Sequence, residues 1–196
     1  MESQSATSSV PVALKEWAVA IEALLEGKQI MLLRKGGIVE ETRDFELLSP
    51  AFYLMPTFEH QKKGLLKPHF QGMLDDTLSG WDPGNLNVTL RAYGEVTEDI
   101  EIRDQETLDR LRDFHIWTDT FAEERLKWKR NKPLHLLLVR MYRLEQPTDI
   151  PIKPAYTGCK SWVKLEDELE MRTKIPVLGD SEFNLRVAQI KVALER

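Results

Sequence analysis

Two cations followed by two glycines form the most chemically suggestive run in this sequence. Arg34, Lys35, Gly36 and Gly37 come directly after an apolar segment. A guanidinium and an ammonium group supply charge to a phosphate, and glycine lets backbone N–H groups approach it closely. A solvated strand end followed by a tight turn is the other interpretation. Neither glycine-rich nucleotide pattern, GxxxxGKS/T or GxGxxG, occurs, so nucleotide binding through those motifs has little support.

A second cluster combines cations with a tryptophan. Residues 125–132 hold five cations around Trp128. Such a stretch could bind a nucleic-acid backbone while the indole stacks on a base. Helical spacing also places Trp128 on the same face as Phe121 and Arg125, so the indole could instead anchor a helix to the core. The residues predicted to bind nucleic acid here are Lys127, Trp128, Lys129 and Arg130.

A third set of candidates lies on two predicted strands. Arg140 and Tyr142 share one face of a strand predicted over residues 134–144, and Trp162 belongs to a strand predicted over residues 159–165. An arginine with two aromatic rings could line a pocket for a flipped base. Ordinary core packing is the alternative for the tryptophan.

Glu59, His60 and Gln61 are the best catalytic candidates by residue type. A carboxylate beside an imidazole can transfer protons, and an acid two positions before glutamine resembles a degenerate Glu-x-Lys nuclease motif. On a strand, however, Glu59 and Gln61 would face one side and His60 the other. A hydrogen-bonded strand end or turn is the alternative. A nuclease would also need Mg²⁺ or Mn²⁺ and a further carboxylate, for which the candidates are Glu16, Asp44 and Glu46.

The histidines and the single cysteine do not form a recognisable metal motif. The histidines stand at positions 60, 69, 115 and 135, and no CxxC, HxH or HExxH spacing occurs. We therefore expect no metal site and no cofactor, with Mg²⁺ required only by the nuclease hypothesis. Cys159 and Ser161 share a predicted strand face. A small buried thiol is favoured over a nucleophile for Cys159, although catalytic triads assemble in space.

Helical periodicity and capping signals predict four helices. Apolar residues follow the helical repeat from Pro11 to Leu25, and Gly27 supplies a C-terminal cap. Asp104 is predicted to cap a short helix, and Thr120 with Glu123 forms a capping box. The remaining predicted segments are a helix from Thr120 to Trp128 that ends before Pro133, and a last helix that begins at Asp180 or Ser181 and carries Phe183, Val187, Ile190 and Leu194.

Five strands are predicted from apolar runs and alternation. Residues 29–33 are apolar on both faces and are expected inside a sheet, as is the segment 134–144. Gly94 is expected to form a bulge in the long alternating strand, and residues 69–85 to form an irregular loop. The predicted strands cover residues 29–33, 51–55, 86–102, 134–144 and 159–165, with an extended connection over residues 146–155.

These elements predict an α+β fold with a mixed, partly barrel-like sheet of about five strands and flanking helices. The length of 196 residues, with 42% hydrophobic and 30% charged residues, is typical of a globular protein. Residues 1–10 are predicted to be a disordered tail, and residues 11–196 a single globular domain.

Charge and hydropathy restrict the classes of partner and location. No apolar stretch approaches the roughly 20 residues needed to span a bilayer, and the N-terminus does not resemble a secretory signal. We therefore expect a cytoplasmic protein without a membrane partner, which agrees with its single cysteine. A net charge of −5 argues against nucleic-acid binding by the whole surface, but a local basic stripe remains compatible with it.

Five short motifs resemble a bacterial family catalogued as domain of unknown function 1802. The resemblance covers roughly residues 12–165 and implies no established activity. Some members are thought to occur beside restriction-endonuclease-type domains, which suggests nucleic acid. The motifs are Ala13 to Ala18, Leu32 to Ile38, Pro56 to Gln61, Leu138 to Tyr142 and Gly158 to Trp162.

A weaker resemblance is to RNA-binding barrels of the pseudouridine-synthase-and-archaeosine-transglycosylase (PUA) type. One branch carries the pattern Gly-x-Lys-x-x-Glu-x-Arg after a helix. Gly27 and Arg34 stand at the matching spacing, but Gln29 replaces the lysine and Leu32 the glutamate. Any role tied to those two positions in the family does not transfer to this chain.

The sequence as a whole favours a non-enzymatic nucleic-acid-binding module, linked to restriction–modification or RNA metabolism. RNA and DNA both remain open as partners. Two alternatives stand beside it: a metal-dependent nuclease with Glu59 as a ligand, and a structural or protein-interaction subunit.

Overall fold

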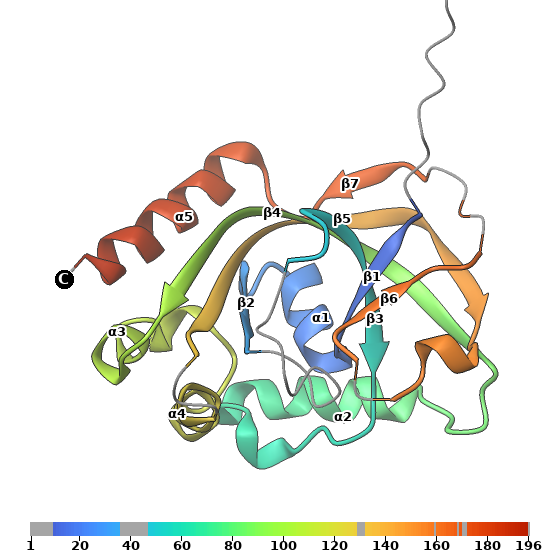
Figure 1. Cartoon of the computed structure of the whole chain (residues 1–196), viewed down its shortest axis with the longest axis horizontal. Coiled ribbons are helices and arrows are strands. Elements are labelled where there is room, and N and C mark those ends of the chain that lie inside the picture. The colour runs from blue at the N-terminus through green and yellow to red at the C-terminus, as the bar shows by residue number, and fades with distance from the viewer. Residues whose placement is uncertain are drawn as a thin grey trace, which may run out of the picture.

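The computed structural model describes residues 10–35, 47–128, 132–158, 160–167, 169 and 172–195. Within these residues lie seven strands and five α-helices (Figure 1). The strands are β1 (Val12–Trp17), β2 (Met31–Arg34), β3 (Ala51–Thr57), β4 (Asn87–Ile102), β5 (Leu134–Pro151), β6 (Trp162–Lys164) and β7 (Lys174–Pro176). The helices are α1 (Ala18–Leu25), α2 (Gln71–Ser79), α3 (Gln105–Asp109), α4 (Asp119–Lys127) and α5 (Asp180–Leu194).

The strands form one mixed sheet in the order β2-β5-β4-β3-β1-β6, with β7 paired to β5. β1 and β3 are parallel and the other pairs are antiparallel, so the predicted α+β class with a mixed sheet is confirmed. The register between β4 and β5 shifts twice, and such bulges increase twist. The two long strands therefore arch over α1 (Figure 1). Among the described residues the end strands β2 and β6 do not pair, so the sheet is not closed into a barrel.

α1 lies inside this arch and is apolar nearly all round. Of its eight residues, all but Glu22 are buried, as expected of a helix enclosed in a core. Ile21 and Leu24 belong to one hydrophobic cluster with Leu137 and Val139 of β5, whereas Val19 and Ala20 belong to a larger cluster. α5 lies on the opposite side of β4 and β5 (Figure 1).

The N-terminal segment differs from its prediction. Residues 12–17 form a strand, and the helix begins only at Ala18. Ala13 pairs with Tyr53 of β3 on one side and with Val163 of β6 on the other. These long-range ladders outweigh the local helical periodicity, because strand preference depends mainly on cross-strand packing.

Other predictions are confirmed or corrected in detail. β4 and β5 lie in the predicted segments, but β5 continues to Pro151 through the predicted connection. Residues 71–79 form α2 rather than part of a loop. β2 is buried but lies at one end of the sheet order. Gly94 is in regular register, and a Cβ there would meet Val139 at 2.8 Å; close packing, not a bulge, explains this glycine.

The predicted helix caps are also confirmed in part and corrected in part. Asp104 caps α3 as predicted, by accepting a hydrogen bond from the Thr107 backbone N–H at 2.8 Å. α4 is capped by Thr118 rather than Thr120, and α5 follows Gly179. None of the helices in the described ranges is both long and apolar enough to cross a membrane.

We predict that Gly27→Ala destabilises the fold by about 1–3 kcal/mol. Gly27 has φ +64°, and an added Cβ would lie 2.7 Å from Leu178. Urea denaturation measures the change in the free energy of unfolding. Gly72→Ala is the matched control, since a Cβ at that α2 position meets nothing within 4 Å. Gly72→Ala should raise the free energy of unfolding by about 0.5–1 kcal/mol. A Gly27→Ala protein as stable as the wild type would contradict the prediction.

His115 should make stability depend on pH. Its side chain is buried, and Nδ1 has no hydrogen-bond partner among the described residues. Burial, reinforced by the Lys67 charge, lowers the pKa of His115 from 6.5 to about 4. Between those values the unfolded chain binds a proton that the folded chain does not, so the free energy of unfolding falls by about 3 kcal/mol as pH falls from 6.5 to 4. Urea denaturation of the His115→Gln variant over this pH range should show a smaller fall in the free energy of unfolding than in the wild-type protein. An equal fall in the two proteins would contradict the prediction.

Candidate binding cleft

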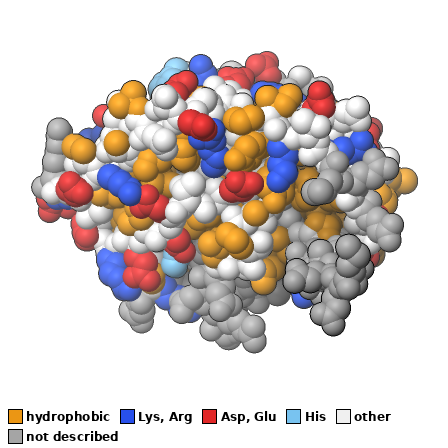
Figure 2. Space-filling view, turned by 90° about the horizontal axis from the view of Figure 1, so that it is seen from above, with side chains coloured by type: hydrophobic (Ala, Val, Ile, Leu, Met, Phe, Trp, Pro, Cys, Tyr) orange, Lys and Arg blue, Asp and Glu red, His pale blue; other side chains and the backbone are white. Residues whose placement is uncertain are grey.

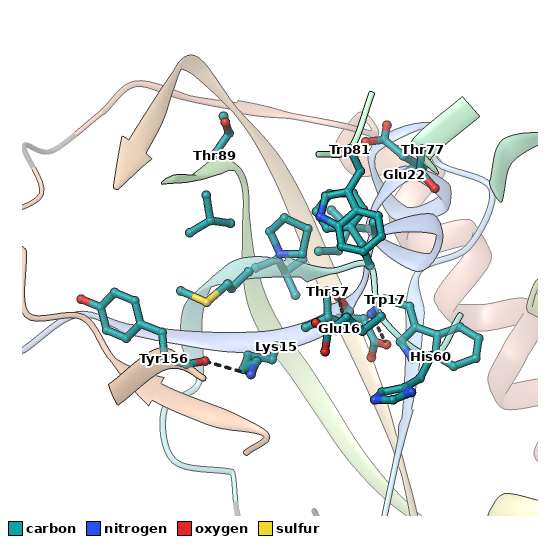
Figure 3. Close-up of a pocket in the computed structure, with 18 of the residues that line it drawn as sticks. Lys15, Glu16, Trp17, Glu22, Thr57, His60, Thr77, Trp81, Thr89 and Tyr156 are labelled. Carbon is teal, nitrogen blue, oxygen red and sulfur yellow. Dashed lines mark hydrogen bonds between the residues drawn. The ribbon is translucent and has the colours of Figure 1, made fainter. Parts of the chain in front are cut away.

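One large cleft runs along α1 from its N-terminal end. Its volume is about 1440 Å³. The ends of β1 and β3, the helices α1, α2 and α4, the start of β4 and the segment after β5 all contribute side chains. In Figure 3, Trp81 stands between Glu22 and Thr77 on one side and Lys15 and Tyr156 on the other.

A buried ion pair lies at the meeting point of β1 and β2. Arg34 Nη1 lies 3.0 Å from Glu16 Oε2, and both side chains are about nine-tenths buried, with 10% and 9% exposed. The other carboxylate oxygen accepts a hydrogen bond from the Trp17 backbone N–H at 2.8 Å. Thr57 Oγ1 donates to the Glu16 carbonyl at 3.1 Å. Arg34 therefore lines the cleft in a fixed position instead of forming a solvated strand end.

A second guanidinium lies beside this pair without its own carboxylate. Arg125 of α4 is half-buried and lies 5.0 Å over the Phe121 ring. Burial lowers its pKa, and the Arg34 charge lowers it further, while Glu16 opposes the shift. Within the described ranges, no hydrogen bond or ion pair joins its guanidinium to another side chain. Arg125 therefore adds a second guanidinium to the part of the cleft lined by Arg34 and Glu16, where Glu124 of α4 also contributes a carboxylate.

Aromatic rings form much of the cleft wall. Trp17 contacts Phe121, with ring centroids 5.9 Å apart. Trp128, just after α4, keeps 36% of its surface exposed. Across the cleft, Phe58 and Trp81 stack with centroids 5.4 Å apart and planes 7° from parallel. These rings offer flat apolar surfaces to a ligand.

The wall opposite Trp81 is held by a lysine. Lys15 Nζ donates hydrogen bonds to the carbonyls of Tyr156 and Gly158, at 2.9 and 2.7 Å (Figure 3). The Tyr156 hydroxyl donates to Asp167 and accepts from the Glu166 backbone N–H, both at 2.8 Å. The segment after β5 is therefore attached to β1 through polar contacts.

The rest of the predicted cation–glycine run lies elsewhere. Lys35 is buried, its ammonium donates to the Leu126 carbonyl, and burial lowers its pKa. Its side chain fixes α4 against the strand end and does not line the cleft. Gly36 and Gly37 lie outside the described residues.

Glu59, His60 and Gln61 form a turn at the cleft edge. Gln61 has a structural role, because its Oε1 accepts a hydrogen bond from the Val19 backbone N–H at 3.0 Å at the start of α1. Glu59 and His60 are exposed, and His60 has φ +65°. In the described part of the chain, no three His, Cys, Asp or Glu side chains are grouped to hold a metal ion. Asp44, Glu46 and Cys159 lie outside that part.

The remaining predicted contacts are not brought to the cleft. Lys127 forms an exposed ion pair with Glu123 at 2.6 Å, and Lys129 and Arg130 lie outside the described residues. Arg140 pairs with Asp180 at 2.5 Å on the α5 side of the sheet. The face seen in Figure 2 shows cations and acids intermingled without an extended basic patch.

Tyr142 and Trp162 do not share a pocket. The Tyr142 hydroxyl donates to Glu95 at 3.1 Å, and its ring continues a row with Tyr93, at 6.5 Å between centroids. Trp162 packs edge-on against Phe52 at 5.1 Å, in the cluster that contacts α1. The fold thus separates two residues that the strand prediction had placed together.

One important cleft residue, Trp81, was missed by the sequence prediction, because it lay in a segment predicted to be loop. Arg125 belonged to the predicted basic stripe of residues 125–132, but its place in the cleft together with Arg34 was not predicted. No sequence signal linked Trp81 to Phe58.

Comparison with known proteins identifies a family but no activity. The model of the family described as Domain of unknown function (DUF1802) matches residues 13–189. The chain belongs to this family. No curated protein matches the sequence.

One solved structure resembles the DUF1802 chain weakly. It is the crystal structure of a tyrosine-to-phenylalanine mutant of ZmASCH from Zymomonas mobilis. The identity is 12% and the TM-score 0.44, with 81% of this chain and 91% of that chain covered. A similarity of this size supports no functional argument, and the expected likeness to PUA-type barrels is not confirmed.

We predict that Arg34→Met destabilises the protein by about 3–5 kcal/mol, because it leaves the Glu16 carboxylate buried and unpaired. Urea denaturation gives the change in the free energy of unfolding. Lys63→Met is the control: it removes an ion pair with Asp75 whose side chains are 51% and 57% exposed, and it should cost about 1 kcal/mol or less. Equal losses in the free energy of unfolding from the two changes would contradict the prediction that the buried Glu16–Arg34 pair matters more to stability than an exposed pair.

Proposed function

We propose that this DUF1802 protein binds a segment of single-stranded nucleic acid in the cleft, as a non-enzymatic module. The observation that carries this proposal is Arg125, a guanidinium that lines the cleft beside Arg34 without a carboxylate partner among the described residues. Guanidinium groups bind phosphate oxygens with two parallel hydrogen bonds, so Arg125 is suited to one phosphate of a strand.

The aromatic wall supports a single strand over a duplex. Bases in a duplex are stacked on one another, whereas unpaired bases can stack on protein rings. Trp128 lies three residues after Arg125 and is 36% exposed, and Trp81 also lines the cleft. Each base–ring stack contributes about 1–3 kcal/mol to binding.

The size of the cleft also supports a ligand larger than one nucleotide. Sites for small molecules commonly have volumes of roughly 300–1,000 Å³, and this cleft has about 1440 Å³. The phosphate contacts that we propose come from Arg34 and Arg125, in a chain whose net charge is −5. We therefore expect few phosphate contacts and a shallow salt dependence. We propose that this binding of single strands serves restriction–modification or RNA metabolism.

Fluorescence polarisation with labelled single-stranded RNA, single-stranded DNA and duplex DNA over a salt series tests the proposal. Single strands should bind, and Arg125→Gln should weaken binding to every sequence. It should also reduce the slope of log affinity against log salt by about 0.7, the value for one lost phosphate contact on a single strand. The measurement is made with and without Mg²⁺, and the products are checked for cleavage.

Lys127→Gln is the matched control on the same helix, since Lys127 pairs with Glu123 outside the cleft. It should leave affinity nearly unchanged. A loss in Lys127→Gln but not in Arg125→Gln would move the binding surface from the cleft to Lys127 and the cations that follow it in the sequence. Mg²⁺-dependent cleavage that disappears in Glu59→Ala would establish the nuclease hypothesis, and no binding at low salt would favour a protein-interaction role.

A further inference from the structure

The end of β2 supplies two consecutive cations with different surroundings. Arg34 lines the cleft, where its guanidinium pairs with Glu16 at 3.0 Å. Lys35 follows directly, is only 3% exposed, and is not among the residues that line the cleft. Successive residues of an extended segment direct their side chains to opposite sides. One short segment can therefore reach both the cleft and the helix beside it.

The Lys35 side chain holds the C-terminal end of α4. Its ammonium donates a hydrogen bond to the Leu126 carbonyl, in the last turn of that helix. A helix leaves its last carbonyls without partners of their own, so a donor from outside the helix is favourable there. The positive charge is also stabilised by the dipole at that end. This contact attaches the end of α4 to the end of β2.

The attachment lies next to Arg125 in the chain. Leu126 follows Arg125, whose guanidinium lines the cleft and lies 5.0 Å over the Phe121 ring. Burial lowers the pKa of Arg125, and the charge of Arg34 lowers it further, so the two guanidiniums lie within range of each other. The start of α4 is attached elsewhere, because the Thr118 N–H donates to the Leu65 carbonyl at 2.9 Å. Of these two attachments, the Lys35 contact is the one beside Arg125.

We infer that Lys35 is a positioning residue, which fixes Arg125 beside Arg34 so that both guanidiniums contact the same bound strand. This inference rests on the proposed binding of single strands and on the role of Arg125 in it. A side chain contributes most to affinity when it is already held in its bound position. Without the Lys35 ammonium, the end of α4 is released from β2, and Arg125 loses most of its contribution to affinity.

A double-mutant cycle on the full chain tests the inference, with fluorescein-labelled oligouridylate as the probe and polarisation at one low salt concentration. We expect Arg125→Gln to lower affinity at least about tenfold in the wild-type background, because it removes a hydrogen-bonded contact between charged groups. In the Lys35→Met background, Arg125→Gln should lower affinity by less than about twofold. The comparison cancels the effect of the lost Lys35 charge, since that charge is absent from both proteins of the second pair.

Lys67→Met is the matched control. The Lys67 ammonium also donates to a backbone carbonyl, that of His115 at 2.6 Å, but this contact lies before the start of α4. Arg125→Gln should therefore keep its full effect in the Lys67→Met background. Circular dichroism checks that each variant is folded at the assay temperature. If Lys35→Met does not fold, Lys35→Gln takes its place, because the shorter side chain keeps an N–H donor but reaches less far.

The possible outcomes separate this inference from the proposed function. An Arg125→Gln effect in the Lys35 variant as large as in the wild-type background would overturn the inference and leave single-strand binding standing. Loss of the effect in Lys67→Met as well would also overturn it, because general loosening of α4 would then explain the result. If the wild-type protein does not bind the oligouridylate, or binds it without any effect of Arg125→Gln, the proposed function falls together with the inference.

Discussion

The enclosure of α1 within the curled sheet is the constraint on which the other features depend. A helix buried nearly all round cannot leave its end groups to water, so they need partners within the protein. Gln61 accepts from the Val19 N–H at the first turn. At the other end, Arg143 donates to the Leu25 carbonyl at 3.0 Å and Arg186 to the Gly27 carbonyl. Residues from three distant segments are therefore fixed around one short helix.

This enclosure also creates the cleft. Because β1 runs directly into α1, Glu16 and Trp17 are held at the helix N-terminus, where a carboxylate is stabilised by the helix dipole and by Arg34. α4 then brings Arg125 to the same carboxylate. The fold thus places two guanidiniums in one part of the cleft, in a chain whose net charge is −5. The overall charge of the protein thus says little about what this side of the cleft can bind.

Membership of the DUF1802 family supplies no chemistry, so the functional argument depends on the arrangement of charged and aromatic groups. The cleft combines two guanidiniums with several aromatic rings. A ligand that matches this combination carries negative charge and a flat ring, and a nucleotide within a single strand has both.

The sequence by itself determined the features whose causes are local: the alternation of β4, the Asp104 cap, the stop at Gly27 and the buried character of β2. It also indicated the α+β class. Only the tertiary structure decided that β1 is a strand, that Arg34 is buried against Glu16, and that Arg125 meets them. The physical reason is that capping and side-chain alternation involve residues a few positions apart, whereas strand pairing and the cleft join residues from the whole length of the chain, and a single sequence carries no signal for such contacts.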